Sequence, residues 1–170
     1  SFLRIANNDS VIAKLHKLES VNFYLQGKVS SKDSSNIVFS FAMPVDGFVT
    51  KGISKENNHN GIDIAAIKGS DVKATLDGLV VFSGYDSITG NTIILSHNHN
   101  LFSLYGHNDT NLVELRKFVL MNSPIAKIGN SGTSDGPHLH FEIWDGEKII
   151  DPRSLIKSYE ENDVSIKKSR

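Results

Sequence analysis

The chain has 170 residues, of which 39% are hydrophobic, and a formal net charge of −1. This is enough for one domain with its own core, but no apolar run reaches the roughly 20 residues that a membrane-spanning helix requires. The near-neutral charge and the scattered basic residues argue against nucleic-acid binding. Because the sequence has no cysteine, thiolate zinc fingers, disulfide scaffolds and cysteine nucleophiles are excluded, and any metal must be held by His, Asp or Glu.

The N-terminal part predicts a helix. Asn8 and Asp9 are good caps for an apolar stripe at helical spacing, so we expect a helix over residues 8–27. It would be either an amphipathic helix docked on the domain or a coiled coil through which the chain self-associates. We assign residues 1–36 to this helical segment and its linker. The first residues have neither a signal-peptide pattern nor an initiator Met, so we expect a mature product or an excised fragment.

Residues 37–157 predict a mainly β domain. Short apolar stretches alternate with turn signals, and the expected strands are Ile37–Phe41, Phe48–Thr50, Ile62–Ala65, Val72–Ala74, Leu79–Ser83, Thr92–Ser96, Leu101–Tyr105, Ile125–Ile128 and His138–Trp144. One short helix is expected over 111–120. Because helices do not alternate with the strands, an antiparallel sheet is favoured, either a sandwich or an open barrel. Residues 158–170 are expected to be a polar tail that is mobile or forms a short surface helix.

Three stretches carry residues suited to metal chemistry. They contain His59 and Asp63, then His107 after a strand, then the pair His138 and His140. Imidazole nitrogens and a carboxylate oxygen are ligands that Zn²⁺ prefers, and three protein ligands leave a fourth position open for water. Two further histidines would then be available for proton transfer and charge stabilisation. The pattern therefore predicts a zinc hydrolase.

The stretch from His138 to Ile143 alternates polar and apolar residues, which is the period of a strand. Its polar residues His138, His140 and Glu142 would share one face. Glu142 would either accept a hydrogen bond that orients an imidazole or be a solvated surface residue. Tyr105 would either add a hydrogen bond to the site or pack across the strands.

Two other groups of residues are competing candidates for a binding site. His97 and His99 have the same spacing as His138 and His140, but they flank an expected hairpin tip, and a flexible, wet tip makes a poor preorganised site. Gly129, Gly132 and Gly136 precede a strand rather than a helix. We therefore expect them to let the backbone approach the site or a substrate, not to cradle a phosphate.

From Met43 to Ile156 the chain resembles the lysostaphin-type (LytM-like) zinc endopeptidases, which cleave peptidoglycan. The resemblance is carried, in the expected order, by the stretches His59–Ala66, Val72–Ala74, Asp77–Val80, Gly90–Ile93, Leu104–His107, Ile128–Gly132, Gly136–Ile143 and Asp151–Pro152. It implies an antiparallel β core with the site in an open groove. It also implies zinc held by His59, Asp63 and His140, with His107 and His138 as the catalytic histidines.

The resemblance further implies that the substrate is a peptide crosslink or stem peptide of peptidoglycan and that the protein acts in the bacterial cell envelope. Some relatives in this family have lost ligands and activate other wall hydrolases. A catalytically silent activator or wall-binding module is therefore the alternative function, although every ligand position is filled in this sequence. A carbohydrate-binding β domain with incidental histidines is a second alternative, and it predicts no metal.

Overall fold

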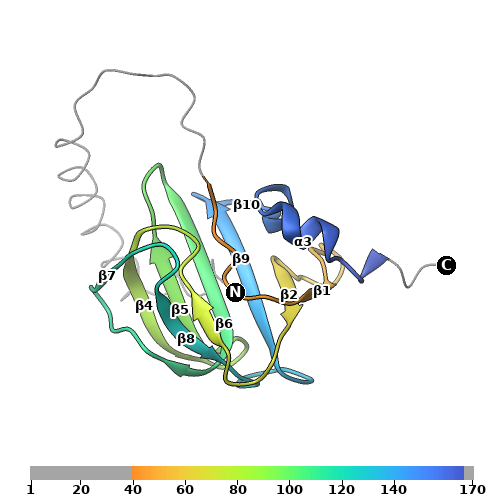
Figure 1. Cartoon of the computed structure of the whole chain (residues 1–170), viewed down its shortest axis with the longest axis horizontal. Helices are drawn as coiled ribbons and strands as arrows, with labels where there is room; N and C mark the ends of the chain where they lie inside the picture. Colours follow the sequence, from red (N-terminus) through yellow and green to blue (C-terminus); the bar gives the residue numbers. More distant parts are fainter. Residues whose placement is uncertain (1–39, 167–170) are drawn as a thin grey trace, which may run out of the picture.

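The computed structural model describes residues 40–166, and most of the regular secondary structure in this part of the chain is β-strand (Figure 1). The strands are β1 (Phe48–Lys51), β2 (Ile62–Ala65), β3 (Asp71–Lys73), β4 (Gly78–Asp86), β5 (Gly90–Ser96), β6 (Leu101–Asn111), β7 (Phe118–Val119), β8 (Pro124–Ile128), β9 (His138–Asp145) and β10 (Lys148–Ile150). A 3-10 helix, η1 (Pro152–Ser154), and a short α-helix, α3 (Lys157–Glu161), follow the last strand. The predicted mainly β class is confirmed. Over residues 40–166, no helix has the length and apolar character needed to cross a bilayer.

The strands form one antiparallel sheet that stays open. Its hydrogen-bonded path runs β1-β2-β9-β6-β5-β4-β7, with β10 added beside β9 and the pair β8 and β3 added beside β6. The long strands β9 and β6 lie near the middle of this path, as Figure 1 shows. Because β1 and β7 end the path without pairing to each other, the sheet does not close into a barrel.

The alternation along β9 separates the core from the site. Leu139, Phe141 and Ile143 belong to the main hydrophobic core, together with Ile62 and Ile64 of the neighbouring strand β2. Since successive side chains of a strand point to opposite faces, the intervening residues of β9 lie on the other face. These residues are His138, His140, Glu142 and Trp144, so burial of the apolar set decides where the polar set must point.

The helix predicted over residues 111–120 is wrong. Strand β6 extends to Asn111, and β7 covers Phe118–Val119. The segment between them bonds to other strands, because the Leu112 N–H donates to the Ile125 carbonyl and the Arg116 N–H donates to the Val80 carbonyl. These tertiary hydrogen bonds, and the left-handed backbone of Arg116 (φ 72°), replace the i to i−4 bonds of a helix.

The C-terminal segment packs on the sheet. Helix α3 is the short surface helix that was one of the two expectations for residues 158–170, but Tyr159 within it is completely buried. The Tyr159 hydroxyl donates to the Val45 carbonyl (2.6 Å) and accepts from the Val45 N–H (3.1 Å). These bonds connect the end of the described chain to its beginning.

Several predictions fall on residues that the structure does not describe. The expected helix over residues 8–27 lies outside the described residues. Of the strand expected over residues 37–41, only residues 40 and 41 are described, and neither is in a strand. The domain boundaries at residues 36 and 157 stay predictions.

Candidate metal centre

The antiparallel pairing of β2 with β9 brings two of the predicted ligands together. Asp63 of β2 and His140 of β9 are directly opposed in the register of the two strands. Opposed residues in an antiparallel pair have Cβ atoms about 5 Å apart, so their side chains meet on one face. His59 lies in the loop before β2, where backbone hydrogen bonds with Ser54 hold it in place. The strand expected over Ile62–Ala65 is confirmed, so Asp63 lies within a strand and His59 precedes it.

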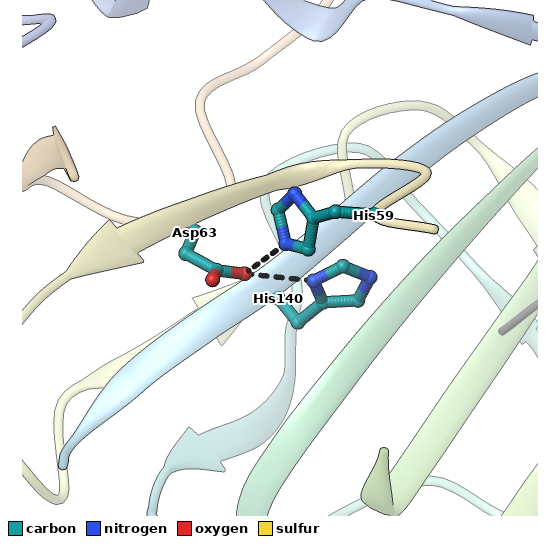
Figure 2. A group of neighbouring side chains, drawn as sticks. All are labelled: His59, Asp63 and His140. Carbon is teal, nitrogen blue, oxygen red and sulfur yellow. Dashed lines mark hydrogen bonds and ion pairs between the residues drawn. The ribbon is translucent and has the colours of Figure 1, made fainter. Parts of the chain in front are cut away.

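The three side chains converge on one point, as Figure 2 shows. One carboxylate oxygen of Asp63, Oδ1, lies 3.0 Å from His59 Nε2 and 2.7 Å from His140 Nδ1. Their candidate ligand atoms all lie within 4.8 Å of one another. The side chains are 8–14% exposed, so the cluster is nearly buried but retains access to solvent.

The hydrogen bonds behind each ring determine which nitrogen carries the proton. His59 Nδ1 lies 2.7 Å from the Gly52 carbonyl, and His140 Nε2 lies 2.8 Å from a carboxylate oxygen of Glu142. Carbonyl and carboxylate oxygens only accept hydrogen bonds, so these two nitrogens are the donors. In a neutral imidazole the other nitrogen then has the lone pair. For both rings, that nitrogen is the one that faces Asp63.

This arrangement fits a divalent cation. Two imidazole lone pairs and a carboxylate oxygen would repel one another at 2.7–3.0 Å unless positive charge lay between them. One bound metal ion would supply that charge. Burial alone would raise the pKa of the Asp63 carboxyl, but the hydrogen bonds from His140 and His59 hold it well below its ordinary range. Asp63 is therefore an ionised carboxylate at neutral pH.

His107 reaches the same face because of a bulge in β6. Tyr105 pairs with Ile93 and Asn108 pairs with Asn91, so Gly106 and His107 together oppose a single residue of β5. His107 has a left-handed backbone (φ 64°), and its N–H donates to the Thr89 carbonyl. Without the extra residue, His107 would alternate onto the opposite face from Gly106, the partner of His140.

His107 and His138 lie side by side next to the three clustered residues. Their ring centroids are 4.7 Å apart, and the His107 ring is 5.9 Å from that of His140. His107 Nδ1 donates to the Ser131 carbonyl (2.7 Å), and His138 Nδ1 donates to the Gly136 carbonyl (2.8 Å). Each ring is thus held with Nε2 able to accept a proton, and His138 Nε2 lies 3.7 Å from Asp63 Oδ1. Burial lowers the pKa of His107 to about 4, so this ring is neutral at pH 7.

The loop that carries His59 rests on the C-terminal segment. The Arg153 guanidinium lies so close to Gly52 that a Cβ on Gly52 would be 3.0 Å from its nearest nitrogen. Arg153 is held by Asp151 and Asp163, each at 2.6 Å, and the Asp163 side chain is only 3% exposed. The Gly52 carbonyl accepts a hydrogen bond from the His59 ring. The ion pairs of Arg153 therefore support the candidate ligand His59 through Gly52.

The structure shows the surroundings of Glu142 and Tyr105, for each of which the sequence allowed two interpretations. Glu142 is completely buried and bonded to His140, so the interpretation of Glu142 as a solvated surface residue is wrong and the orienting one is confirmed. Tyr105 packs against Phe141 in the core, and its hydroxyl accepts from the Thr75 N–H. Tyr105 therefore packs across the strands and does not face the site.

The two histidines and the glycines that were competing candidates for a site have different surroundings. His97 is 4% exposed and hydrogen-bonded to Asp77 and Ser103, so the expectation of a wet hairpin tip is wrong for His97, whereas His99 is exposed. Among the glycines, a Cβ on Gly129 or Gly132 would lie under 3 Å from neighbouring backbone, so these two do allow close backbone approach. That approach positions Ser131, which lies between them and holds His107. For Gly136 the expectation is wrong, because a Cβ there would meet nothing within 4 Å. The supporting carbonyls of Gly52, Ser131 and Gly136 could not be predicted from the sequence, since no side-chain pattern marks a backbone acceptor.

Comparisons with known proteins agree with this arrangement. The sequence model of peptidase family M23 matches residues 57–152 of this chain. The chain is 40% identical over 126 residues to the murein hydrolase activator NlpD of Salmonella dublin, which covers 72% of this chain and 33% of that protein. It is similar in structure to a zinc-containing peptidase from Vibrio cholerae, with a TM-score of 0.57, 31% identity and coverage of 66% and 39% of the two chains. It is also similar to the catalytic domain of lysostaphin from Staphylococcus simulans, with a TM-score of 0.56, 27% identity and coverage of 66% and 90%.

An open antiparallel sheet with a His-Asp-His cluster on one face places this chain among the metallopeptidase-like β folds. The chain belongs to peptidase family M23, as its resemblance to the lysostaphin-type proteins implied. It spans about a third of the length of the activator protein that it matches.

Proposed function

We propose that this protein is a zinc-dependent endopeptidase that hydrolyses peptide crosslinks or stem peptides of bacterial peptidoglycan. The observation that carries the proposal is the convergence of His59 Nε2 and His140 Nδ1 on Asp63 Oδ1 at 3.0 and 2.7 Å. Two imidazole nitrogens and one carboxylate oxygen form a ligand set typical of catalytic zinc, in which a fourth position stays open. His59, Asp63 and His140 are the proposed ligands.

When bound, zinc would polarise a water molecule and lower its pKa from about 16 to about 7. His107 and His138 are the proposed catalytic residues, because both rings stand beside the ligands with Nε2 able to accept a proton. One of them takes a proton from the attacking water and passes it to the leaving amine. The other, in its protonated form, donates a hydrogen bond to the oxyanion that forms from the peptide carbonyl.

The proposed substrate and location follow from the relatives. The matched proteins include a murein hydrolase activator and the catalytic domain of lysostaphin, which is described as an antimicrobial peptidase. Murein is the peptidoglycan of the bacterial wall, so the cell envelope is the proposed location. Self-association through residues 8–27 remains a prediction from the sequence.

A second function is supported by the name of the 40% identical relative, a murein hydrolase activator. In this alternative the chain keeps the fold and stimulates another wall hydrolase without cutting a bond itself. The two functions differ in what the intact cluster of His59, Asp63 and His140 is needed for: turnover in the first, and at most structure in the second.

The test is to incubate the zinc-loaded protein with muropeptides of defined crosslink and to identify the products by mass spectrometry. We expect cleavage of a peptide bond that a chelator abolishes and added zinc restores. His140→Ala should lose both stoichiometric zinc and cleavage, while the matched control His99→Ala, at an exposed histidine, should keep both. If the wild-type protein binds zinc but cleaves no muropeptide, and instead accelerates a second wall hydrolase, the endopeptidase proposal is refuted in favour of the activator. If His140→Ala still binds one zinc ion, the ligand assignment is wrong.

A further inference from the structure

We propose that Glu142 and Trp144 act with His140 as a positioning relay, in which the indole N–H and the imidazole N–H share one carboxylate and thereby hold His140 in its metal-binding tautomer. This inference rests on the proposed zinc site and goes beyond it, because it assigns a role to two residues that touch neither the metal position nor a substrate. Both are positioning residues and not catalytic ones.

The relay lies along one face of β9. His140, Glu142 and Trp144 are two residues apart in turn, so their side chains stand in a row on the face that carries the candidate metal centre. His140 Nε2 lies 2.8 Å from Glu142 Oε1, and Trp144 Nε1 lies 2.7 Å from Glu142 Oε2. Each ring thus has its own oxygen of the same carboxylate.

The Trp144 indole explains why position 142 requires a carboxylate and not an amide. An indole N–H can only donate, so the Glu142 oxygen facing Trp144 must be an acceptor. The other oxygen must accept from His140 Nε2, because a proton on that nitrogen leaves the lone pair on Nδ1, the atom 2.7 Å from Asp63. A carboxylate meets both demands at once, whereas an amide has a single acceptor oxygen.

The effect of a Glu142→Gln substitution follows from this difference in the number of acceptor oxygens. If the amide oxygen turned toward His140, the NH₂ group would face the Trp144 N–H and two donors would oppose each other. If the amide turned the other way, its NH₂ would donate to His140 Nε2, and the ring proton would move to Nδ1. The second arrangement removes the lone pair that a metal needs, so the near-isosteric change from Glu to Gln should weaken metal binding.

Packing holds the carboxylate in place. Glu142 is completely buried and Trp144 is 1% exposed. Gly61, at the entrance to β2, lies so close that a Cβ there would be 2.8 Å from Glu142 Cγ and 2.3 Å from the Phe141 carbonyl oxygen. The absence of a side chain on Gly61 therefore lets the His59 to Asp63 segment approach β9 and the Glu142 side chain.

The experiment is a zinc titration of four proteins against a competing chelator: the wild type, Glu142→Gln, Trp144→Phe and the double variant. Outer hydrogen bonds to metal ligands are typically worth 10- to 100-fold in affinity, so Glu142→Gln should weaken zinc binding by about that factor. Trp144→Phe should change it by less than about threefold. The double variant should recover most of the loss, because without the indole N–H the amide oxygen can turn to His140.

A spectroscopic readout accompanies the titration. With ¹⁵N-labelled histidine and ¹¹³Cd in place of zinc, the metal coupling should appear on His140 Nδ1 in the wild type and in the double variant, and be weakened or lost in Glu142→Gln. Recovery by a second substitution separates the relay from a packing role, in which the two losses would add. A double variant as weak as Glu142→Gln, or a Glu142→Gln protein with wild-type affinity, would overturn the relay. Failure of the wild type to bind either metal would instead refute the proposed zinc site, and the relay with it.

Discussion

His97 should make the protein lose stability in a defined acidic range. The ring is 4% exposed, with Nδ1 donating to the Asp77 carbonyl and Nε2 2.7 Å from Ser103 Oγ. The His97 ring cannot move toward Gly78, since even a Cβ on Gly78 would lie 2.7 Å from His97 Nδ1. Burial lowers the pKa of His97 from 6.5 to about 4, because a charged imidazole would lose its hydration.

The direction and size of this pH-dependent change in unfolding free energy follow from proton linkage. Below pH 6.5 the unfolded chain binds a proton at His97, while the folded protein does not bind it until about pH 4. The stabilisation is therefore fully present above pH 6.5, falls as the pH drops from 6.5 to 4, and is lost below that. The two pKa values differ by about 2.5, and one pKa unit corresponds to about 1.4 kcal/mol, so about 3 kcal/mol of unfolding free energy is at stake.

The assay is urea unfolding of the chelator-treated protein at several pH values between 7.5 and 4, so that metal loss does not contribute. We expect the wild type to lose about 3 kcal/mol more over this range than His97→Asn, which keeps a donor for the Asp77 carbonyl but does not titrate. Other titrating groups are common to both proteins and cancel in the difference. Parallel stability curves for the two proteins, or an NMR titration of the folded His97 ring near pH 6.5, would refute the reasoning.

Three further outcomes are expected. Zinc uptake at pH 7 should release protons, which an indicator dye would detect. The reason is that the hydrogen bonds of His140 outweigh the effect of its burial and raise its pKa to about 9 in the metal-free protein. Zinc uptake without proton release would contradict this prediction. Arg153→Met should lower the free energy of unfolding in urea by about 3 kcal/mol and weaken zinc binding. The control Lys157→Met, which breaks an exposed ion pair, should lower it by less than about 0.5 kcal/mol. Equal effects of the two substitutions would contradict the supporting role of Arg153. Tyr159→Phe should cost about 1–2 kcal/mol in the same assay by leaving Val45 without its partner, and an unchanged midpoint would show that the C-terminal helix is not held this way.

The local pattern was sufficient where side chains alternate along one strand. The period of two from His138 to Ile143 predicted which residues enter the core, and Leu139 and Phe141 are indeed completely buried. It failed where contacts from elsewhere decide the backbone. Residues 111–120 have no strong strand pattern, and their conformation comes from hydrogen bonds to β4 and β8. Tyr159 lies in a polar stretch, and only its contact with Val45 explains its burial.

The candidate site shows the same division. The residue types and spacing of His59, Asp63 and the pair His138 and His140 predicted a zinc-type ligand set, because donor chemistry and strand period are properties of short stretches. Their roles as ligands and catalysts stay predictions. The proximity itself came from the register of β2 against β9, which opposes Asp63 to His140 across 77 positions of the chain.

By itself, the sequence determined the fold class, the family resemblance and the identity of the five candidate residues. Only the tertiary structure decided that a bulge turns His107 onto the site face and that Glu142 is buried between His140 and Trp144. It also decided which nitrogen of each ring is free, because the acceptors that set this are mostly backbone carbonyls. A backbone carbonyl has the same chemistry in every residue, so its position becomes informative only once the chain has folded.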